Sequence, residues 1–511
     1  MNKLRTAYLF LVSLFFYFKT SGVFVILLLF TVLSDFLWAR LIARSQKSWL
    51  RKYLLSQSVI LNLLVLVYFK YSYFFAESFK AFTGAHLQYF NHFAAFSNTF
   101  FFTHFDVNQL LLPVGVSFFT FQSLSYTIDV YRGKVEPVKS IIDYGFFVSF
   151  FPHLVAGPIV KAHDFLNQIY QKYELSRQEF GLAVFWILNG FLKKIVADYL
   201  ALNYVDRIFE NPNLFSGFET ILGVFGYSIQ IYMDFSGYTD MAIGLALLFG
   251  YRLKMNFNSP YKAITVSDFW KRWHISLSSW LQEYLYFPLG GNRQGSLGSY
   301  ICIGIIAFVL VLLSAQEWIL FVLVALAVMV LVSAYFSKAI RKSLNTNVNL
   351  MVTMLLGGLW HGSSWLFLIW GGLNGLGLVV QKFWSRYSPF RNSENLVVRL
   401  LCVALTLCFI SFTRIFFRSS DLPTVYSIFD RIGNYPGFEH SLAIVQGYQN
   451  VLLIMLLAYL VHWIPESWKE FYRHWFAKQH VMVMLLIGIV AVLTAYQFMS
   501  GDMQPFIYFQ F

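Results

Sequence analysis

Two histidines are the residues of this chain whose types and surroundings could carry chemistry. His361 lies in the tripeptide Trp360-His361-Gly362, inside a long apolar stretch, residues 349–380, that predicts a membrane-embedded helix. An ionisable side chain in a bilayer is costly, so such a residue is by default a functional candidate. A neutral imidazole accepts a proton near pH 7 and could activate a hydroxyl for attack on an acyl carbonyl. A structural hydrogen-bonding role and a place in a transport pathway are the alternatives for His361.

The second histidine, His274, ends the basic and aromatic segment FWKRWH at residues 269–274. An ordinary histidine at a membrane boundary is the competing interpretation for His274. Lys271 and Arg272 have two interpretations as well. They could anchor the chain at the cytoplasmic surface, or they could meet the phosphates of a donor such as coenzyme A or a phosphopantetheine arm.

A polar stretch lies between two expected apolar helices, residues 216–233 and 237–250. Each of its side chains would need a partner in lipid. The stretch could form the polar wall of a substrate chamber, or an interhelical hydrogen-bond network that only holds the bundle together. Its candidate chamber residues are Gln230, Tyr232, Asp234, Ser236, Tyr238 and Asp240.

His153 lies in the segment FPHLVAGPI, residues 151–159, where proline and glycine indicate a turn that could bring it to the same chamber. The structural role is favoured for this residue. The chain has no Gly-x-Ser-x-Gly elbow, P-loop or dinucleotide fingerprint, which argues against an NTP-driven pump. Cysteines 302, 402 and 408 lie in apolar runs without metal-ligand spacing, so we expect no metal and no bound cofactor.

Composition places the chain in a membrane. Of its 511 residues, 58% are hydrophobic and only 12% are charged, about half the charged fraction of a soluble domain. The net charge of +13 needs no nucleic acid to explain it, because Lys and Arg gather in short loops as the positive-inside rule expects. Lys3 and Arg5 precede an apolar run without a small-residue cleavage site, so we expect a retained first helix rather than a signal peptide.

The elements that must position these residues are predicted to be transmembrane helices, and we expect eleven to thirteen crossings. A span needs roughly 20 apolar residues. Two segments, 141–160 and 277–290, carry proline, glycine and polar residues, and are predicted to be broken, re-entrant elements lining an internal chamber. The candidate spans are 6–19, 22–43, 53–75, 109–130, 141–160, 180–203, 216–233, 237–250, 298–315, 317–337, 350–380, 397–417, 446–464 and 480–499.

Charge sets the expected orientation. Loops 40–52 and 131–139 and the segment 252–272 are rich in Lys and Arg, which predicts that they are cytoplasmic. Loop 76–108 contains Lys80 as its single Lys or Arg and should face outside. The N-terminus is then inside. We expect one membrane-embedded domain over residues 1–511, with helices of the C-terminal part in 397–511.

Seven blocks of the chain resemble the membrane-bound O-acyltransferases (MBOAT), and within that family the bacterial alginate O-acetyltransferase type. The resemblance runs from about residue 110 to about residue 380, and the C-terminal residues 505–511 are also similar to that subfamily. The blocks are LPVGVSFFTFQ (112–122), DVYRG (129–133), FPHLVAGPI (151–159), QIYMDFSGYTDMAIG (230–244), DFWKRWHISLS (268–278), PLGGNR (288–293) and MLLGGLWHG (354–362).

The resemblance implies an all-α, multipass bundle around a central funnel or tunnel. It implies that His361 is the catalytic residue, and that His274 is the second characteristic residue and lines the same tunnel. Trp360, which precedes His361 in the sequence, is a further candidate for the tunnel lining. The expected reaction moves an acyl group, most simply acetyl, from a cytoplasmic thioester toward an extracytoplasmic polysaccharide. The donor would be acetyl-CoA or a phosphopantetheine-linked acyl group on an acyl carrier protein.

The resemblance also implies a relay through a periplasmic SGNH-type acetyltransferase partner, and a location in the bacterial inner membrane. D-alanyl transfer toward teichoic acid is the alternative within the family, and a transporter or flippase is the alternative outside it. One departure from the family pattern is the extra apolar hairpin at 298–337, between the PLGGNR block and the Trp-His-Gly helix. An even number of added crossings would keep His361 on its usual side of the membrane.

Overall fold

The computed structural model describes residues 2–84, 90–314, 337–389, 394–498 and 504–506, with isolated residues between 318 and 336. Every regular element in these residues is a helix. The predicted all-α fold is therefore confirmed. The physical reason is that a chain in lipid must satisfy each backbone N–H and C=O group internally, and a helix does so within one segment.

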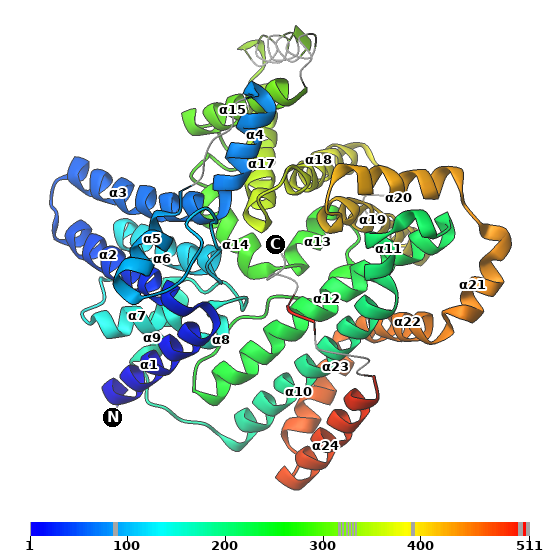
Figure 1. The fold of residues 1–511 in the computed structure, drawn as a ribbon, viewed down its shortest axis with the longest axis horizontal. Coiled ribbons are helices and arrows are strands. Elements are labelled where there is room, and N and C mark those ends of the chain that lie inside the picture. The colour runs from blue at the N-terminus through cyan, green and yellow to red at the C-terminus, as the bar shows by residue number, and fades with distance from the viewer. Residues whose placement is uncertain are drawn as a thin grey trace. The chain divides into compact units, whose positions relative to one another are not determined.

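The chain forms two compact units, each built from separate stretches of sequence. Figure 1 colours the chain by residue number. Unit 1 comprises residues 1–62, 114–277 and 393–511, and unit 2 comprises residues 63–113 and 278–392. The expectation of one domain over the whole chain stays a prediction.

Unit 1 is built around two long helices, α10 (Arg177–Leu200) and α12 (Gly217–Leu248), which lie side by side in Figure 1. Each begins with a capping box, Ser176 with Glu179 and Ser216 with Glu219, which satisfies the first backbone N–H groups. A Cβ atom on Gly190 of α10 would lie 2.3 Å from a carbonyl oxygen of α12. The absence of a side chain there lets the two backbones approach closely.

The other helices of unit 1 pack on this pair or on one another. From the N-terminal part come α1 (Asn2–Ser21), η1 (Gly22–Phe24), α2 (Val25–Arg44), α6 (Val116–Arg132), α7 (Ile141–Ser149), α8 (Phe151–Leu154) and α9 (Ala162–Ile169). Short helices near α10 and α12 are η3 (Ala201–Val205), α11 (Asp206–Glu210), η4 (Pro212–Leu214), η5 (Pro260–Lys262) and α13 (Val266–Arg272). The C-terminal part adds α19 (Leu396–Arg418), α20 (Leu422–Asn434), η7 (Phe438–His440), α21 (Ser441–Gly447), α22 (Gln449–Trp463), α23 (Glu466–Ala477) and α24 (Val481–Phe498).

Unit 2 is organised by the antiparallel pair α17 (Lys338–His361) and α18 (Trp365–Tyr387). Its other elements are η2 (Val67–Tyr71), α4 (Ser72–Thr83), α5 (His92–Phe101), η6 (Gln282–Tyr286) and α15 (Leu297–Ser314). Two helices, α3 (Ser48–Leu66) and α14 (Ile275–Leu281), contain residues of both units. Of the apolar hairpin predicted at 298–337, the first arm is α15, whereas most of the second arm lies outside the described residues.

Five helices of the described residues are long and apolar enough to cross a membrane: Lys3–Arg44, Ser48–Lys80, Arg177–Glu210, Trp365–Tyr387 and Leu396–Arg418. Two bent pairs, Phe438–Gly447 with Gln449–Trp463 and Glu466–Ala477 with Val481–Gln497, raise the number to seven. This is fewer than the expected eleven to thirteen crossings. Helices α12 and α17 have 32 and 24 residues but are not among the five, because polar residues interrupt them.

The two segments predicted to be broken are broken. Residues 141–160 divide into α7, the single turn α8 and a non-helical stretch, and residues 277–290 divide into the end of α14, the π-helix η6 and turns. Two other expectations were wrong in detail. The polar stretch 230–240 does not separate two helices, since α12 runs through it. The stretch 349–380 is not one helix, because α17 ends at His361 and α18 begins at Trp365.

Candidate functional site

His361 is the last residue of α17, where the backbone leaves the helix. The residue is 4% exposed, and its ring lies edge-on between the rings of Trp360 and Trp370, with centroids 5.0 Å and 5.1 Å away. Gly362 follows in an extended conformation. A Cβ atom there would lie 2.0 Å from the ring of Phe367, so glycine is the residue that this close approach allows. The tripeptide is thus a helix terminus packed among aromatic rings.

Two side chains from the π-helical turn η2 hold the end of α17. The Lys70 ammonium donates hydrogen bonds to the carbonyl oxygens of Trp360, at 2.6 Å, and of His361, at 3.1 Å. The Tyr71 hydroxyl donates to the carbonyl oxygen of Leu359 at 2.8 Å. The last carbonyls of a helix lack partners within it and carry partial negative charge. A half-buried ammonium and a phenol at this end therefore fix the backbone that carries His361.

His274 lies between α13 and α14 and is fully buried. Its backbone has a φ angle of 45°, which a residue with a side chain rarely adopts. The ring stands edge-on to Phe235 of α12, 4.7 Å between centroids. Its Nδ1 lies 3.2 Å from Oδ1 of Asn256.

Asn256 determines the tautomer of His274. Its Oδ1 also accepts hydrogen bonds from the backbone N–H of Ser276, at 3.0 Å, and from the Ser276 hydroxyl, at 2.8 Å. A backbone N–H can only donate, so this atom of Asn256 is the oxygen, and Nδ1 of His274 must carry the proton. The lone pair is then on Nε2. Burial lowers the pKa of His274 to about 3, so the ring is a neutral acceptor at physiological pH.

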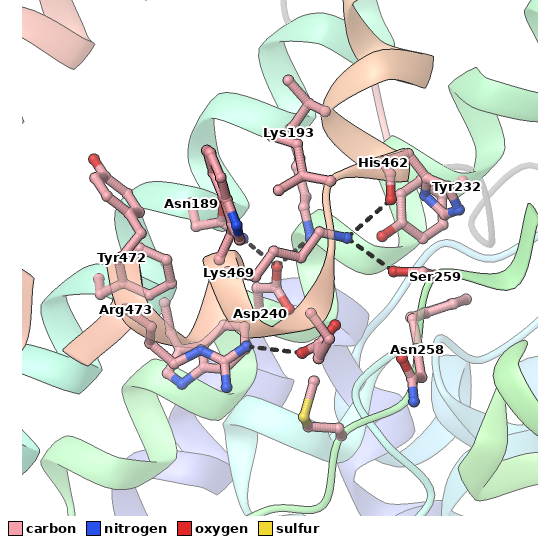
Figure 2. A pocket seen from close by; sticks show the side chains of 18 of the residues that line it. Asn189, Lys193, Tyr232, Asp240, Asn258, Ser259, His462, Lys469, Tyr472 and Arg473 are labelled. Carbon is pink, nitrogen blue, oxygen red and sulfur yellow. Dashed lines mark hydrogen bonds and ion pairs between the residues drawn. The ribbon is translucent and has the colours of Figure 1, made fainter. Parts of the chain in front are cut away.

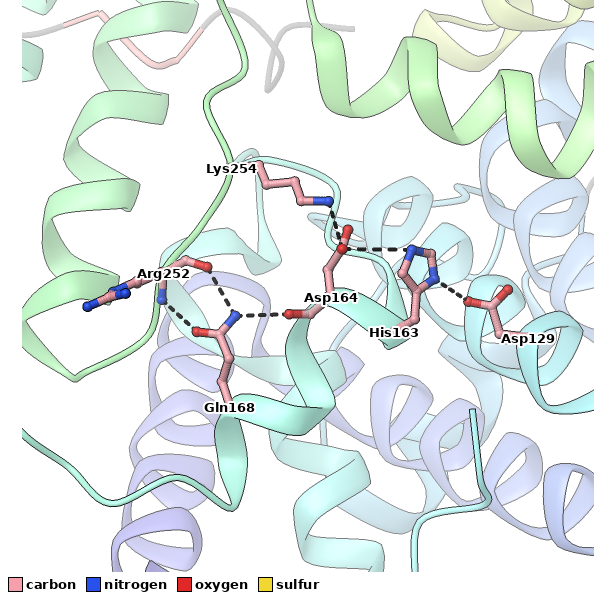
Figure 3. Close-up of polar contacts among 6 residues, drawn as sticks. All are labelled: Asp129, His163, Asp164, Gln168, Arg252 and Lys254. Atoms are coloured by element: carbon pink, nitrogen blue, oxygen red, sulfur yellow. Dashed lines mark hydrogen bonds and ion pairs between the residues drawn. The ribbon is translucent and has the colours of Figure 1, made fainter. Parts of the chain in front are cut away.

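The segment that carries Asn256 is fastened to α9 by a polar network, drawn in Figure 3. Gln168 exchanges two hydrogen bonds with the backbone of Arg252, at 2.8 Å and 3.2 Å. Lys254 pairs with Asp164 at 2.7 Å. His163 bonds Asp129 of α6 through Nδ1 at 2.8 Å. These contacts tie residues 252 and 254, which precede Asn256 in the chain, to α9, and they tie α9 to α6.

His153 is fully buried in α8, with its Nε2 3.1 Å from the carbonyl oxygen of Phe147. Its ring packs edge-on against Phe150 and Phe165. This environment agrees with the structural role that the sequence favours. The segment still touches the His274 region, because the backbone N–H of Ile159 donates to the Ser276 hydroxyl at 3.0 Å.

The polar residues of α12 point in different directions because they lie on one continuous helix, where neighbours two positions apart face away from each other. Asp234 pairs with Lys194 of α10 at 2.8 Å, and Asp240 pairs with Lys193 at 2.6 Å. These two carboxylates therefore belong to the interhelical network that was one of the two interpretations. Tyr232 and Asp240 also line a cavity, shown in Figure 2.

The remaining predicted residues have varied surroundings. Gln230 and Ser236 are buried, at 7% and 1% exposure, and Tyr238 packs its ring on Phe506 with centroids 4.7 Å apart. Arg272 forms an ion pair with Asp268 one turn away at 2.8 Å, and Lys271 is exposed. Donor binding by Lys271 and Arg272 stays a prediction. His361 belongs to unit 2, whereas His274, His153 and the α12 residues belong to unit 1.

Sequence reasoning missed three residues that position the histidines: Lys70, Tyr71 and Asn256. Lys70 had a signal, since it is a charged residue inside an apolar span, and such residues are rarely without function. Asn256 had no such signal, because it lies outside any helix, and its contacts with His274 and Ser276, 18 and 20 residues later, follow no local spacing rule.

The fold and these sites define a multipass, all-α membrane protein with histidines held at helix ends. The model of the membrane-bound O-acyltransferase family matches residues 46–342, more than half of the chain. This chain belongs to that family, and it is an O-acyltransferase. The matched range ends before His361, so the family model itself does not include the Trp-His-Gly tripeptide.

Individual relatives narrow the comparison. A probable alginate O-acetylase AlgI of Pseudomonas syringae pv. tomato is 33% identical over 422 residues, covering 81% of this chain and 67% of the relative. A peptidoglycan O-acetyltransferase of Helicobacter pylori is 31% identical, covering 82% of this chain and 72% of the relative. A teichoic acid D-alanyltransferase of Bacillus subtilis is 22% identical, covering 60% and 69%.

Proposed function

We propose that this protein moves an acetyl group from a cytoplasmic thioester across the membrane for O-acetylation of an extracytoplasmic polysaccharide. The observation that carries the proposal is the similarity to two relatives named for O-acetyl transfer, each over more than four fifths of this chain. The buried position of His361 at the end of α17 supports a role for this residue at the chemistry.

In the proposed mechanism His361 acts as the base or as the residue that contacts the thioester. The aromatic rings on both sides of His361 keep water away, which strengthens any polar interaction that the imidazole makes. Lys70 and Tyr71 fix the backbone at the helix end, so the ring is placed before the substrate arrives. His274 is a tunnel residue whose neutral Nε2 accepts a hydrogen bond.

The donor and partners are part of the proposal. The donor is acetyl-CoA or an acetylated phosphopantetheine on an acyl carrier protein. The acetyl group either goes directly to the glycan hydroxyl or passes to a periplasmic SGNH-type acetyltransferase that completes the reaction. We place the protein in the bacterial inner membrane, where a cytoplasmic donor and a periplasmic acceptor can both be reached.

D-alanyl transfer toward teichoic acid is the second candidate, and the observation that favours it is the similarity to the D-alanyltransferase. The lower identity, 22% against 33%, makes acetyl transfer the better supported activity. A dedicated acyl-carrier protein encoded beside this chain would favour D-alanyl transfer, and a neighbouring secreted SGNH protein would favour acetyl transfer.

The test is the O-acetyl content of extracytoplasmic glycan in cells that carry the wild type, His361→Ala or His274→Ala. Removal of a general base lowers a rate by about 10²- to 10⁴-fold, so we expect the ester to disappear in the His361 variant at normal membrane abundance. His440→Ala is the matched control, because the His440 side chain is 74% exposed. Normal ester content in the His361 variant would contradict the proposed mechanism. Addition of D-alanine, in place of acetyl, by the wild-type protein would favour D-alanyl transfer.

A further inference from the structure

A cavity in unit 1 lies between α10, α12, the segment 255–259, the end of α22 and α23 (Figure 2). Its volume of about 440 Å³ is in the usual range for small-ligand sites, roughly 300–1,000 Å³. Asp240 and Tyr232 line it, but neither histidine at 274 or 361 does. Phe257 of the cavity wall packs edge-on against both Tyr232 and Phe235, and Phe235 in turn packs on His274, so the cavity is one aromatic layer away from that histidine.

The charges around the cavity do not balance. Lys193 is matched by Asp240 at 2.6 Å, and Arg473 lies 3.7 Å from Glu466. Lys469 is different, because its ammonium donates to two neutral oxygens, Ser259 Oγ at 2.8 Å and the His462 carbonyl at 2.9 Å, as Figure 2 shows. No ion pair of Lys469 is found within the described residues. The cavity therefore has one cation in excess.

Two cationic side chains at the cavity, Lys469 and Arg473, have N–H donors beyond those that their contacts use. An ammonium has three N–H donors, and the contacts of Lys469 use two. The Nε of Arg473 is buried and has no acceptor within the part of the chain that the structure describes. A phosphate oxygen is a charged acceptor that could bond the remaining N–H groups of both side chains. Ser259, at the cavity wall, has a strained φ angle of 43°, as functional sites often do.

The helix that supplies Lys469 and Arg473 has the character of an interfacial helix. Its exposed side carries large aromatic residues, Trp468 at 71% and Phe471 at 74% exposure, and it meets α24 at a bend of 118°. Aromatic rings gather where a bilayer meets water, and phosphate groups are found at the same depth. Trp468 also lines the cavity, so the cavity lies next to this exposed aromatic surface.

From these observations we infer that the cavity binds a phosphate-bearing ligand, with Lys469 and Arg473 as its anion-binding residues. Two sources share this chemistry. One is the headgroup of an anionic phospholipid, and the other is the pyrophosphate of a coenzyme A donor. The second source rests on the proposed function, whereas the first does not.

The test measures binding without catalysis. The purified full-length protein, in nanodiscs of phosphatidylcholine, is titrated with coenzyme A by calorimetry, and in a separate arm the nanodiscs contain phosphatidylglycerol and thermal stability is recorded. We expect one probe to bind or stabilise the wild type, and the effect to be about tenfold weaker in Lys469→Gln and Arg473→Gln. Lys478→Gln is the control, because Lys478 is an exposed cation just after the same helix.

A response to phosphatidylglycerol alone identifies the lipid as the ligand, and a response to coenzyme A identifies the donor. If neither probe binds, or if both variants bind like the wild type, the inference is overturned. Melting temperatures of the variants without probe separate lost binding from misfolding, and Arg473→Gln leaves the two Lys469 hydrogen bonds in place. Loss of glycan ester in His361→Ala is independent of these outcomes, so the inference and the proposed function can fail separately.

Discussion

At the scale of single residues, the two histidines are held by different means. His274 is held through its side chain, because Asn256 accepts from Nδ1 and fixes the tautomer. His361 is held through its backbone, because Lys70 and Tyr71 bond the carbonyls of the last turn of α17. The Asn256 contact determines which nitrogen of His274 can accept a hydrogen bond. The Lys70 and Tyr71 contacts determine the position of the backbone from which the His361 side chain extends.

Asn256→Ala tests the Asn256 contact. The change leaves three buried donors, on His274 and Ser276, without their acceptor. An unsatisfied buried donor costs about 1–3 kcal/mol, so we expect a lower melting temperature and a large loss of glycan ester. Asn213→Ala, at an exposed site of unit 1, should change neither. An Asn256→Ala protein with wild-type stability and ester content would show that this oxygen does not position His274.

At the scale of elements, the pair α17 and α18 places His361. Gly358 of α17 and Gly371 of α18 face each other, and a Cβ atom on Gly358 would lie 2.3 Å from the carbonyl oxygen of Phe367. The neighbouring Gly362 allows the chain to leave the helix beside a phenylalanine ring. Small residues thus do two things here, bringing two helices together and ending one of them.

Gly358→Ala should therefore be destabilising by about 1–3 kcal/mol, as for other overpacked sites, because the contact is with backbone that cannot move aside. Gly372→Ala is a matched control in the same helix pair, since its Cβ atom would be 3.4 Å from a leucine methyl group, an ordinary contact. Thermal unfolding of both variants in detergent compares them directly. Equal melting temperatures would contradict the close approach of α17 and α18.

At the scale of the whole molecule, the distribution of charge predicts how the protein is oriented in the membrane. The net charge of +13 comes from 38 basic and 25 acidic residues, and 13 of the basic residues lie in the segments 40–52, 131–139 and 252–272. These segments are predicted to be cytoplasmic, and the proposed acetyl donor is cytoplasmic as well. We therefore expect the donor to enter from the side of the membrane on which these segments lie.

Cysteine labelling tests this orientation. In a variant without cysteines 302, 402 and 408, we expect a membrane-impermeant maleimide added to spheroplasts to label Asn108→Cys and to leave Gln46→Cys unlabelled until the cells are opened. Both residues are exposed in the structure. The reverse pattern would place the N-terminus outside and would contradict a cytoplasmic donor at the 252–272 segment.

The sequence alone determined the membrane class, the helical fold, the two broken segments and the resemblance to the family, because hydropathy, proline and glycine act locally along the chain. It did not predict that α12 runs unbroken through its polar stretch. Asp234 and Asp240 are accommodated in that helix because they pair with lysines of another helix, α10, and this pairing is not visible in the local sequence. Nor did it predict that His361 ends a helix or that Asn256 fixes the tautomer of His274. Those facts depend on residues far apart in the chain, such as Lys70 and Asn256, and only tertiary packing brings such residues to the atoms that they bond.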